Sequence, residues 1–216
     1  MCSREAMQRD VARIALNDAA DSGFALAGSG AIREHGLTQR PTADVDLFTV
    51  MSAQDKFSTA VESIRERLEE AGYEVDVPRQ SESFTRMVVS SHLGLQTELD
   101  LGIDWREREP VALEVGPVLA VEDAVSNKIL ALYSRGETRD FLDVDSIRGS
   151  GRYTDRELLE MAAASDPGFD ESMFAERLEM ADRIEPFEVA GYGVSTTELE
   201  AVKNRCKDWG QHIKRI

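Results

Sequence analysis

The chain contains 216 residues, of which 42% are hydrophobic and 31% are charged. This composition is too apolar for a disordered chain and too charged for a membrane protein, and no apolar run approaches the roughly 20 residues that a membrane span needs. The 25 basic and 41 acidic side chains give a formal net charge of −16, spread evenly between residues 1–110 and 111–216, which excludes a basic half that grips nucleic acid.

The first residues and the cysteines together predict a cytoplasmic protein with no membrane partner. The start, MCSREAMQRD, lacks the apolar core of a secretion signal. Cys2 and Cys206 lie near opposite ends of the chain, so they offer neither a disulfide framework nor the spacing of metal ligands. A reducing compartment suits both observations.

Helical and strand patterns alternate through the first part of the chain. Apolar residues at i, i+4, i+7 and i+8 predict an amphipathic helix from Arg4 to Ser22, ended by Gly23. The apolar run Phe24–Ala27 predicts a strand, which enters a Gly-Ser-Gly turn at residues 28–30. A short helix is expected after the turn.

A long helix and four more strands are predicted before residue 104. The helix is expected between a capping box at Ser52 and Asp55 and a stop at Gly72. The last strand alternates strictly between apolar and polar residues, which places Glu98 and Asp100 on its polar face. The strands are predicted at Asp44–Val50, Tyr73–Val77, Phe84–Ser90 and Leu95–Ile103.

Beyond Pro117 nearly every segment has a helical pattern. Thr154 and Glu157 form a second capping-box pattern. We therefore predict an α/β (α+β) fold, with a sheet and its helices in residues 1–115 and a helical part in residues 116–216. The helices are predicted at Val121–Ser134, Thr138–Ile147, Thr154–Ala164, Phe169–Ile184 and Thr196–Ile213.

The sequence Asp44-Val45-Asp46 is the first candidate for chemistry. Alternate residues of a strand point to the same face, so the two carboxylates are expected to lie close together. Like charges at close range favour a bound cation, and Mg²⁺ prefers carboxylate ligands. Taken alone, the commoner interpretation of the pattern is a pair of exposed strand carboxylates on an acidic protein.

Two further features favour a site for a metal and a triphosphate. The Gly28-Ser29 turn joins a strand to a helix, where glycine lets backbone amides approach phosphate closely, although such turns are also ordinary connections. The late strand supplies a third carboxylate from Glu98, Asp100 or Asp104, of which we prefer Asp100. A phosphate cradle, a carboxylate pair and an acid near a hydroxyl nucleophile are together what a site for a metal and a triphosphate requires.

The stretch LAGSGAIREHGLTQRPTADVDLFT resembles the nucleotidyltransferase superfamily, whose pattern is a Gly-Ser turn followed by an Asp-x-Asp strand. The segments 128–135 and 139–144 narrow the resemblance, because they are similar to the helical lysine motif and the Arg-Asp-x-x-Asp motif of the AbiEii/AbiGii branch, which includes the MenT-type toxins. The matches span residues 26–147. The Gly-Ser-Gly turn departs from the Gly-Gly-Thr turn that this branch often has.

The resemblance implies a nucleotidyltransferase-like mixed β-sheet flanked by helices, with a site that the helical part completes. It assigns nucleotide binding to Gly28, Ser29, Thr42, Lys128 and Arg139. It assigns metal binding to Asp44, Asp46 and Asp100, and catalysis to Asp44, Asp46, Lys128 and Asp143. If Asp143 is the third acid, Glu98 and Asp100 surround the metal without binding it.

The implied function is that of a Mg²⁺-dependent toxin of a toxin–antitoxin system. Such a toxin takes an NTP, transfers its NMP to the 3′ end of tRNA with release of pyrophosphate, blocks translation and is restrained by a cognate antitoxin protein. Two alternatives stay open. The acidity favours a small, cationic, hydroxylated acceptor, as for antibiotic-modifying relatives, and a catalytically silent binding module would keep the fold without the reaction.

A locally basic segment near the C-terminus is a candidate contact for RNA. It contains Lys203, Arg205, Lys207, Lys214 and Arg215. Such a run suits contact with a phosphate backbone, but more often it is simply a solvated helix face.

Overall fold

The computed structural model describes residues 3–18 and 22–215, and the chain forms two compact units. The sheet unit comprises Met1–Glu34 and Thr42–Ala120, and the helical unit comprises His35–Pro41 and Val121–Ile216. The predicted division between residues 115 and 116 remains a prediction. Within the described residues, no helix combines the length and the hydropathy needed to cross a membrane.

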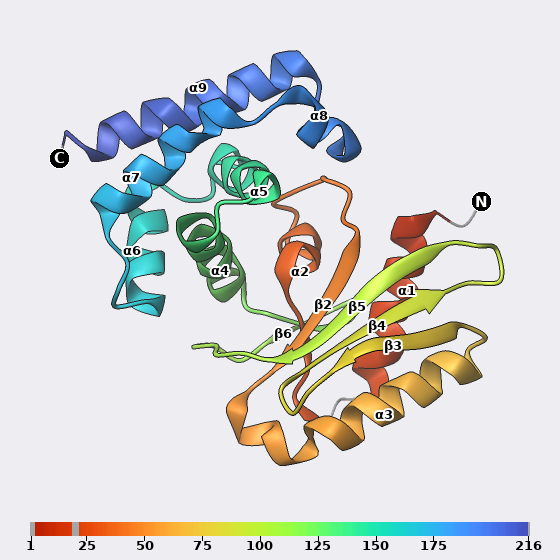
Figure 1. Ribbon diagram of the computed structural model, residues 1–216. Helices are drawn as coiled ribbons and strands as arrows, with labels where there is room; N and C mark the ends of the chain where they lie inside the picture. The colour runs from red at the N-terminus through yellow and green to blue at the C-terminus, as the bar shows by residue number, and fades with distance from the viewer. Residues whose placement is uncertain (1–2, 19–21, 216) are drawn as a thin grey trace. The chain divides into compact units, whose positions relative to one another are not determined.

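A mixed seven-stranded sheet forms the centre of the sheet unit (Figure 1). Its strands are β1 Ala25–Leu26, β2 Asp44–Thr49, β3 Glu74–Gln80, β4 Phe84–Ser90, β5 Gln96–Ile103, β6 Val111–Leu113 and β7 Gly116–Val118. They lie in the order β3-β4-β5-β2-β1-β7-β6, with β2 parallel to β5, β1 parallel to β7 and the other neighbours antiparallel. The helices of the sheet unit are α1 Arg4–Asp18, α2 Gly28–Glu34 and α3 Gln54–Glu70, with a 3-10 turn, η2 Met51–Ala53, before α3.

One face of this sheet is apolar and packs against helices. Val45 and Leu47 of β2 and Leu99 and Leu101 of β5 are buried there, where α1 contacts both strands. Because strand side chains alternate, the residues between them lie on the opposite face. We call this the polar face; it carries Asp44, Asp46 and Phe48 of β2, Glu98, Asp100 and Gly102 of β5, and Phe84, Arg86 and Val88 of β4.

The predicted strands are confirmed within a few residues, and β4 has the predicted bounds. Strands β6 and β7, at the transition to the helical part, were not predicted from the sequence. Each has three residues, too few to show an alternation, and Pro117 of β7 suggested a break although it pairs with Ala112 at the sheet's edge. Gly116, with φ +124°, supplies the turn between them.

The helical expectations of the sheet unit hold with two differences. The first helix is confirmed over Arg4–Asp18, and the predicted residues 19–21 lie outside the described residues. The capping box predicted at Ser52 and Asp55 is wrong, because the N-cap of α3 is Ala53 and makes no side-chain hydrogen bond. The helix is fixed instead by its buried stripe, Phe57, Val61, Ile64 and Leu68.

Helices make up the regular structure of the helical unit. They are α4 Val121–Ser134, α5 Thr138–Gly149, α6 Asp155–Ser165, α7 Glu171–Glu179, α8 Pro186–Val189 and α9 Thr196–Ile213, with 3-10 turns η3 Met180–Arg183 and η4 Ala190–Tyr192. The rings of Phe174 on α7 and Trp209 on α9 meet edge to face, with centroids 5.3 Å apart. The α4 helix packs on α5 and α6.

The helical predictions agree closely with this unit. The bounds of α4 and α9 are as predicted, and the capping box of Thr154 and Glu157 is confirmed at the start of α6. The long helix predicted from Phe169 to Ile184 is divided into α7 and η3, and the short α8 was not predicted. The predicted fold class, a mixed sheet with helices followed by a helical part, is confirmed.

Candidate active site

The Asp44–Asp46 pair lies at the start of β2, beside the turn that leads into α2. The amide of Ala27 donates a hydrogen bond to the carbonyl of Asp46 at 2.8 Å. Gly28 has φ +56°, and a Cβ on it would lie 1.8 Å from Oδ2 of Asp46. Only glycine therefore lets this turn contact the Asp46 carboxylate.

The residues after Gly28 belong to α2 rather than to an open turn. Ser29 is buried, and Gly30 faces Leu26, because a Cβ there would lie 2.9 Å from the leucine's Cδ1. The structure thus brings the Gly-Ser segment to one member of the carboxylate pair, as the motif requires.

Asp100 stands directly across from Asp46 on the neighbouring strand, and Glu98 stands across from Asp44. Arg86 of β4, which is the cross-strand partner of Asp100, binds that carboxylate in a bidentate manner at 2.7 and 2.6 Å. Its third nitrogen lies 3.0 Å from Glu98. Hydrogen bonds to Asp100 raise the pKa of Arg86, so the guanidinium stays charged against these acids.

The positions of Asp44, Asp46 and Asp100 determine whether these carboxylates can bind a divalent metal. No group of three or more candidate ligands is assembled among the described residues. Mg²⁺ is usually held by one or two protein carboxylates together with substrate phosphates, and Asp44 and Asp46, which share the polar face of β2, fit that requirement. Asp100, expected as a third ligand, is instead ion-paired to Arg86.

Thr42, expected to bind nucleotide, makes its polar contacts inside the fold. Its hydroxyl donates to Oε1 of Gln8 at 3.1 Å, and Nε2 of Gln8 donates to the carbonyl of Thr42 and to Thr97. All three side chains are buried. They attach the chain leading into β2 to α1, and so fix where Asp44 begins the strand.

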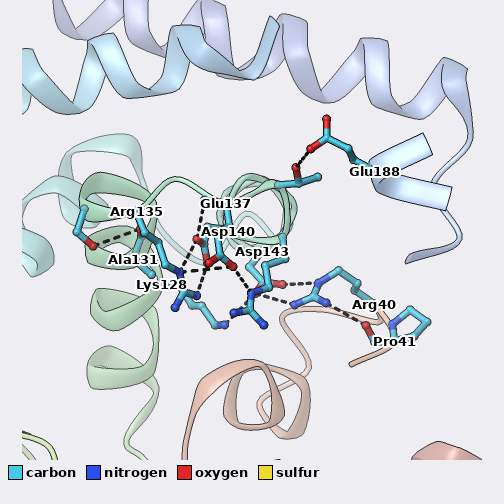
Figure 2. Close-up of polar contacts among 12 residues, drawn as sticks. Arg40, Pro41, Lys128, Ala131, Arg135, Glu137, Asp140, Asp143 and Glu188 are labelled. Carbon is cyan, nitrogen blue, oxygen red and sulfur yellow. Dashed lines mark hydrogen bonds and ion pairs between the residues drawn. The ribbon is translucent and has the colours of Figure 1, made fainter. Parts of the chain in front are cut away.

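A second charged cluster lies wholly within the helical unit. Figure 2 shows Arg40 and Lys128 converging on the carboxylate of Asp143. Arg40 donates two hydrogen bonds of 2.9 Å to it, and the ammonium of Lys128 lies 2.9 Å from Oδ2. Asp143 is 0% exposed, while Arg40 and Lys128 are 9% and 6% exposed.

Burial raises the pKa of the Asp143 carboxyl, but Lys128 and Arg40 outweigh burial and leave that pKa lowered. Asp143 is therefore a buried anion with two cationic partners. Lys128 was predicted from the sequence as a site residue, whereas Arg40 was not. An aspartate inside the apolar run Phe141–Val144 signals that a buried cation is required, but it does not identify which one.

The two remaining charges of the Arg-Asp-x-x-Asp motif form ion pairs near the start of α5. Arg135 binds the buried Asp140 at 2.9 and 2.8 Å, and Asp140 also accepts from the amide of Glu137 (Figure 2). Nε of Arg139 lies 2.9 Å from Glu137. In the structure, these contacts order the start of α5.

Neighbouring acids form ion pairs with most of the basic residues in the C-terminal segment. Arg205 binds Asp145 in a bidentate manner at 2.7 Å, and Lys203 and Lys214 pair with Glu200 and Glu179 at 2.9 and 2.8 Å. Lys207 lies 3.6 Å from Asp182. The C-terminal segment is therefore not a continuous cationic stripe, because four of its five basic side chains pair with acids of the helical unit.

The mixed sheet, the glycine turn on Asp46 and the carboxylate pair define the nucleotidyltransferase class of fold. More narrowly, the chain belongs to the nucleotidyl transferase AbiEii toxin family of type IV toxin–antitoxin systems, which matches residues 9–205. The protein is thus a nucleotidyltransferase toxin of a toxin–antitoxin system, with an NTP substrate and an antitoxin partner. Nucleotidyltransferases typically use the NTP with a divalent metal.

Solved structures support the fold at low sequence identity. JHP933 from Helicobacter pylori has a TM-score of 0.60 and 17% identity, covering 99% of this chain and 93% of its own. The nucleotidyltransferase toxin MenT4 from Mycobacterium tuberculosis has a TM-score of 0.55 and 13% identity, with coverages of 98% and 87%. The antibiotic-resistance factor ANT(2'')-Ia has a TM-score of 0.52 and 15% identity, with coverages of 74% and 91%. Comparison with curated protein sequences gives no match.

Proposed function

We propose that this toxin transfers an NMP from an NTP to the 3′ end of tRNA in the cytoplasm and so blocks translation, in a Mg²⁺-dependent reaction. The observation that carries the proposal is the contact of Gly28 with the Asp46 carboxylate, which unites the phosphate turn and the acid pair of the motif. Membership of the AbiEii family supports transfer as the reaction. The tRNA acceptor rests on the resemblance to MenT-type toxins.

In the sheet unit, Gly28 and Ser29 are proposed to face the triphosphate, and Asp44 and Asp46 to hold Mg²⁺. When bound, the metal would supply positive charge to the phosphates. Asp100 is proposed as an additional ligand only when Arg86 releases it. Thr42 supports the site through Gln8, since its hydroxyl is already bonded there.

In the helical unit, Lys128 is proposed to balance phosphate charge, with Arg139 as a further nucleotide contact. Asp143 fixes the ammonium of Lys128 and the guanidinium of Arg40. An ammonium held on a buried carboxylate keeps its position before substrate arrives, which lowers the cost of ordering it. The catalytic role assigned to Asp143 is then one of positioning.

The transfer itself breaks one bond and forms one. The oxygen of the acceptor hydroxyl attacks the α-phosphorus, the bond from that phosphorus to the pyrophosphate oxygen breaks, and pyrophosphate leaves. The hydroxyl proton passes to bulk water. Positioning and neutralisation of charge, rather than covalent catalysis, account for the rate.

Transfer of label tests this proposal. Purified protein is incubated with Mg²⁺, total tRNA and each α-³²P-labelled NTP in turn. We expect label on tRNA from the unsubstituted protein and at least a hundredfold less from Asp46→Asn, which keeps the shape of the side chain but removes its charge. Asp76→Asn is the matched control, because Asp76 is an exposed acid on β3 of the same unit, and it should retain activity.

One observation favours a second candidate, a small cationic acceptor. The four acids Asp44, Asp46, Glu98 and Asp100 lie on one face of a chain with net charge −16. Such a surface attracts cations and repels RNA. Label on an added aminoglycoside, with none on tRNA, would establish this candidate, and label on neither acceptor would favour a silent binding module.

A further inference from the structure

A row of aromatic side chains crosses the polar face next to the carboxylates. Phe48 of β2 pairs in register with Gly102 of β5, and Gly102 pairs with Phe84 of β4. Phe48 is two residues after Asp46 on the same face, which is about 7 Å along the strand. The row therefore begins within the length of one nucleotide from the proposed metal ligands.

Gly102 creates the space for this row. A Cβ at this position would lie 3.1 Å from two ring atoms of Phe48 and 3.6 Å from the ring of Phe84. Both rings thus extend over the glycine, and both remain partly exposed. Glycine inside a strand weakens it and often marks a place where a ligand approaches the backbone.

A cation lies on the same row. The guanidinium of Arg79, on the edge strand β3, stacks over the ring of Phe84, 5.0 Å from the ring centroid. Arg79 is exposed and stands across from Arg86. Among the described residues, Arg79 forms no ion pair with a carboxylate, whereas Arg86 is paired with Asp100. We call Phe48, Gly102, Phe84 and Arg79 the aromatic shelf.

We propose that the aromatic shelf binds the 3′-terminal base of a single-stranded RNA acceptor. Bases stack on aromatic side chains of a sheet, and an arginine beside them both stacks and attracts phosphate. A cationic sugar would be repelled by the guanidinium of Arg79, which already occupies the face of Phe84. This inference rests on the proposed transfer to RNA and names the surface that receives the acceptor.

The distribution of ion pairs over the described residues also favours the aromatic shelf as the RNA-binding surface. Four of the five basic residues in the C-terminal segment are paired with acids, so that segment offers little to RNA. The shelf combines flat apolar surface with a guanidinium that has no acidic partner among the described residues. Stacking is also insensitive to the acidity that opposes phosphate contact over the rest of the chain.

Equilibrium binding in the Asp46→Asn background tests the shelf without any need for transfer. The probe is a single-stranded RNA with 2-aminopurine as its 3′-terminal base, whose fluorescence is quenched on stacking. We expect quenching with this protein, and about a tenfold or greater loss of affinity with added Phe84→Ala. Phe84→Trp should restore both, which excludes misfolding as the cause. The matched control is Phe187→Ala, because Phe187 is a 79% exposed phenylalanine in the helical unit.

Steady-state kinetics distinguishes a failure of the shelf proposal from a failure of the proposed transfer reaction. In the active protein, Phe84→Ala should raise KM for RNA about tenfold and leave KM for NTP unchanged. An increase confined to KM for NTP would assign the rings to the incoming nucleotide and overturn the proposal, as would unchanged quenching in Phe84→Ala. Quenching that depends on Phe84 in a protein that never labels tRNA would uphold the shelf and reject the proposed reaction.

Discussion

Gly28 is constrained twice, by its own backbone and by the side chain beside it. Its φ of +56° lies in the left-handed region, which costs other residues about 1–2 kcal/mol. A methyl group would in addition overlap the Asp46 carboxylate, at 1.8 Å from Oδ2 and 2.7 Å from Cγ. The backbone strain affects stability, whereas the overlap moves a proposed metal ligand.

Substituting Gly28→Ala should therefore abolish most nucleotidyl transfer while the protein still folds. We expect at least a hundredfold loss of transfer and a decrease in the free energy of unfolding of about 1–3 kcal/mol. Labelled transfer and urea denaturation measure the two effects. Gly72→Ala is the control, because Gly72 has φ +90° but no neighbour within 4 Å of a Cβ; it should lose similar stability and no activity. Equal activities of the two variants would show that the Gly28–Asp46 contact is not needed.

At this scale, the sequence predicts local pairs and not distant ones. Asp44 and Asp46 are two positions apart on one strand, so the period of a strand is enough to place them together. Arg86 reaches Asp100 only because β4 pairs with β5 in one register, and Arg40 reaches Asp143 across 103 positions of sequence. A residue's type does not specify such partners.

At the scale of elements, Asp143 ties three segments of the helical unit together. It lies on α5, Lys128 lies on α4 and Arg40 lies in the segment His35–Pro41. Removing the anion from such a buried cluster leaves cations without compensation, which typically costs about 3–5 kcal/mol. The cluster is therefore expected to hold α4, α5 and residues 35–41 in place.

Asp143→Asn should lower the free energy of unfolding by about 3–5 kcal/mol at pH 7, as measured by urea denaturation. The lowered pKa of Asp143 sets the pH dependence. Its contribution is complete above the unfolded pKa of about 3.9 and is lost as pH falls through the lower folded value. The difference between the wild type and Asp143→Asn should thus be constant from pH 5 to 7 and shrink below about pH 4.

The control for that variant is Asp155→Asn. Asp155 also binds an arginine in a bidentate manner, Arg148 at 2.6 and 2.9 Å, but both side chains are about 30% exposed. Exposed pairs typically contribute about 0.2–1 kcal/mol. Similar losses from both variants would show that burial gives the Asp143 cluster no special role.

Element prediction succeeded where a segment carries its own signal. The apolar faces of α4 and α9 and the alternation of β4 and β5 are complete within each segment, and their bounds follow. Strands β6 and β7 exist because they pair with each other and, through β7, with β1, so neither has a pattern of its own. The Ser52 cap failed because η2 occupies the residues where the cap would form.

At the scale of the whole molecule, the net charge of −16 opposes RNA binding. Ion pairing with acids determines which basic side chains are left to attract phosphate. The sequence indicated a basic C-terminal segment because it shows only neighbours along the chain. The neutralising acids Asp145, Glu179 and Asp182 are remote in sequence from α9 and become its neighbours through folding. Local charge is thus a poor guide to an RNA-binding surface in a protein this acidic.

The salt dependence of RNA binding should accordingly be shallow. One phosphate contact, the number that Arg79 can supply while Arg86 stays paired with Asp100, gives a slope of about −0.7 in log affinity against log salt for a single strand, or about a 2.6-fold loss between 50 and 200 mM. Fluorescence titrations of the 2-aminopurine RNA measure this slope. Replacing Lys203, Lys207 and Lys214 together by Gln should change the affinity by less than about twofold, because each is already paired. A slope steeper than about −3, flattened by that triple substitution, would instead place the RNA backbone on α9.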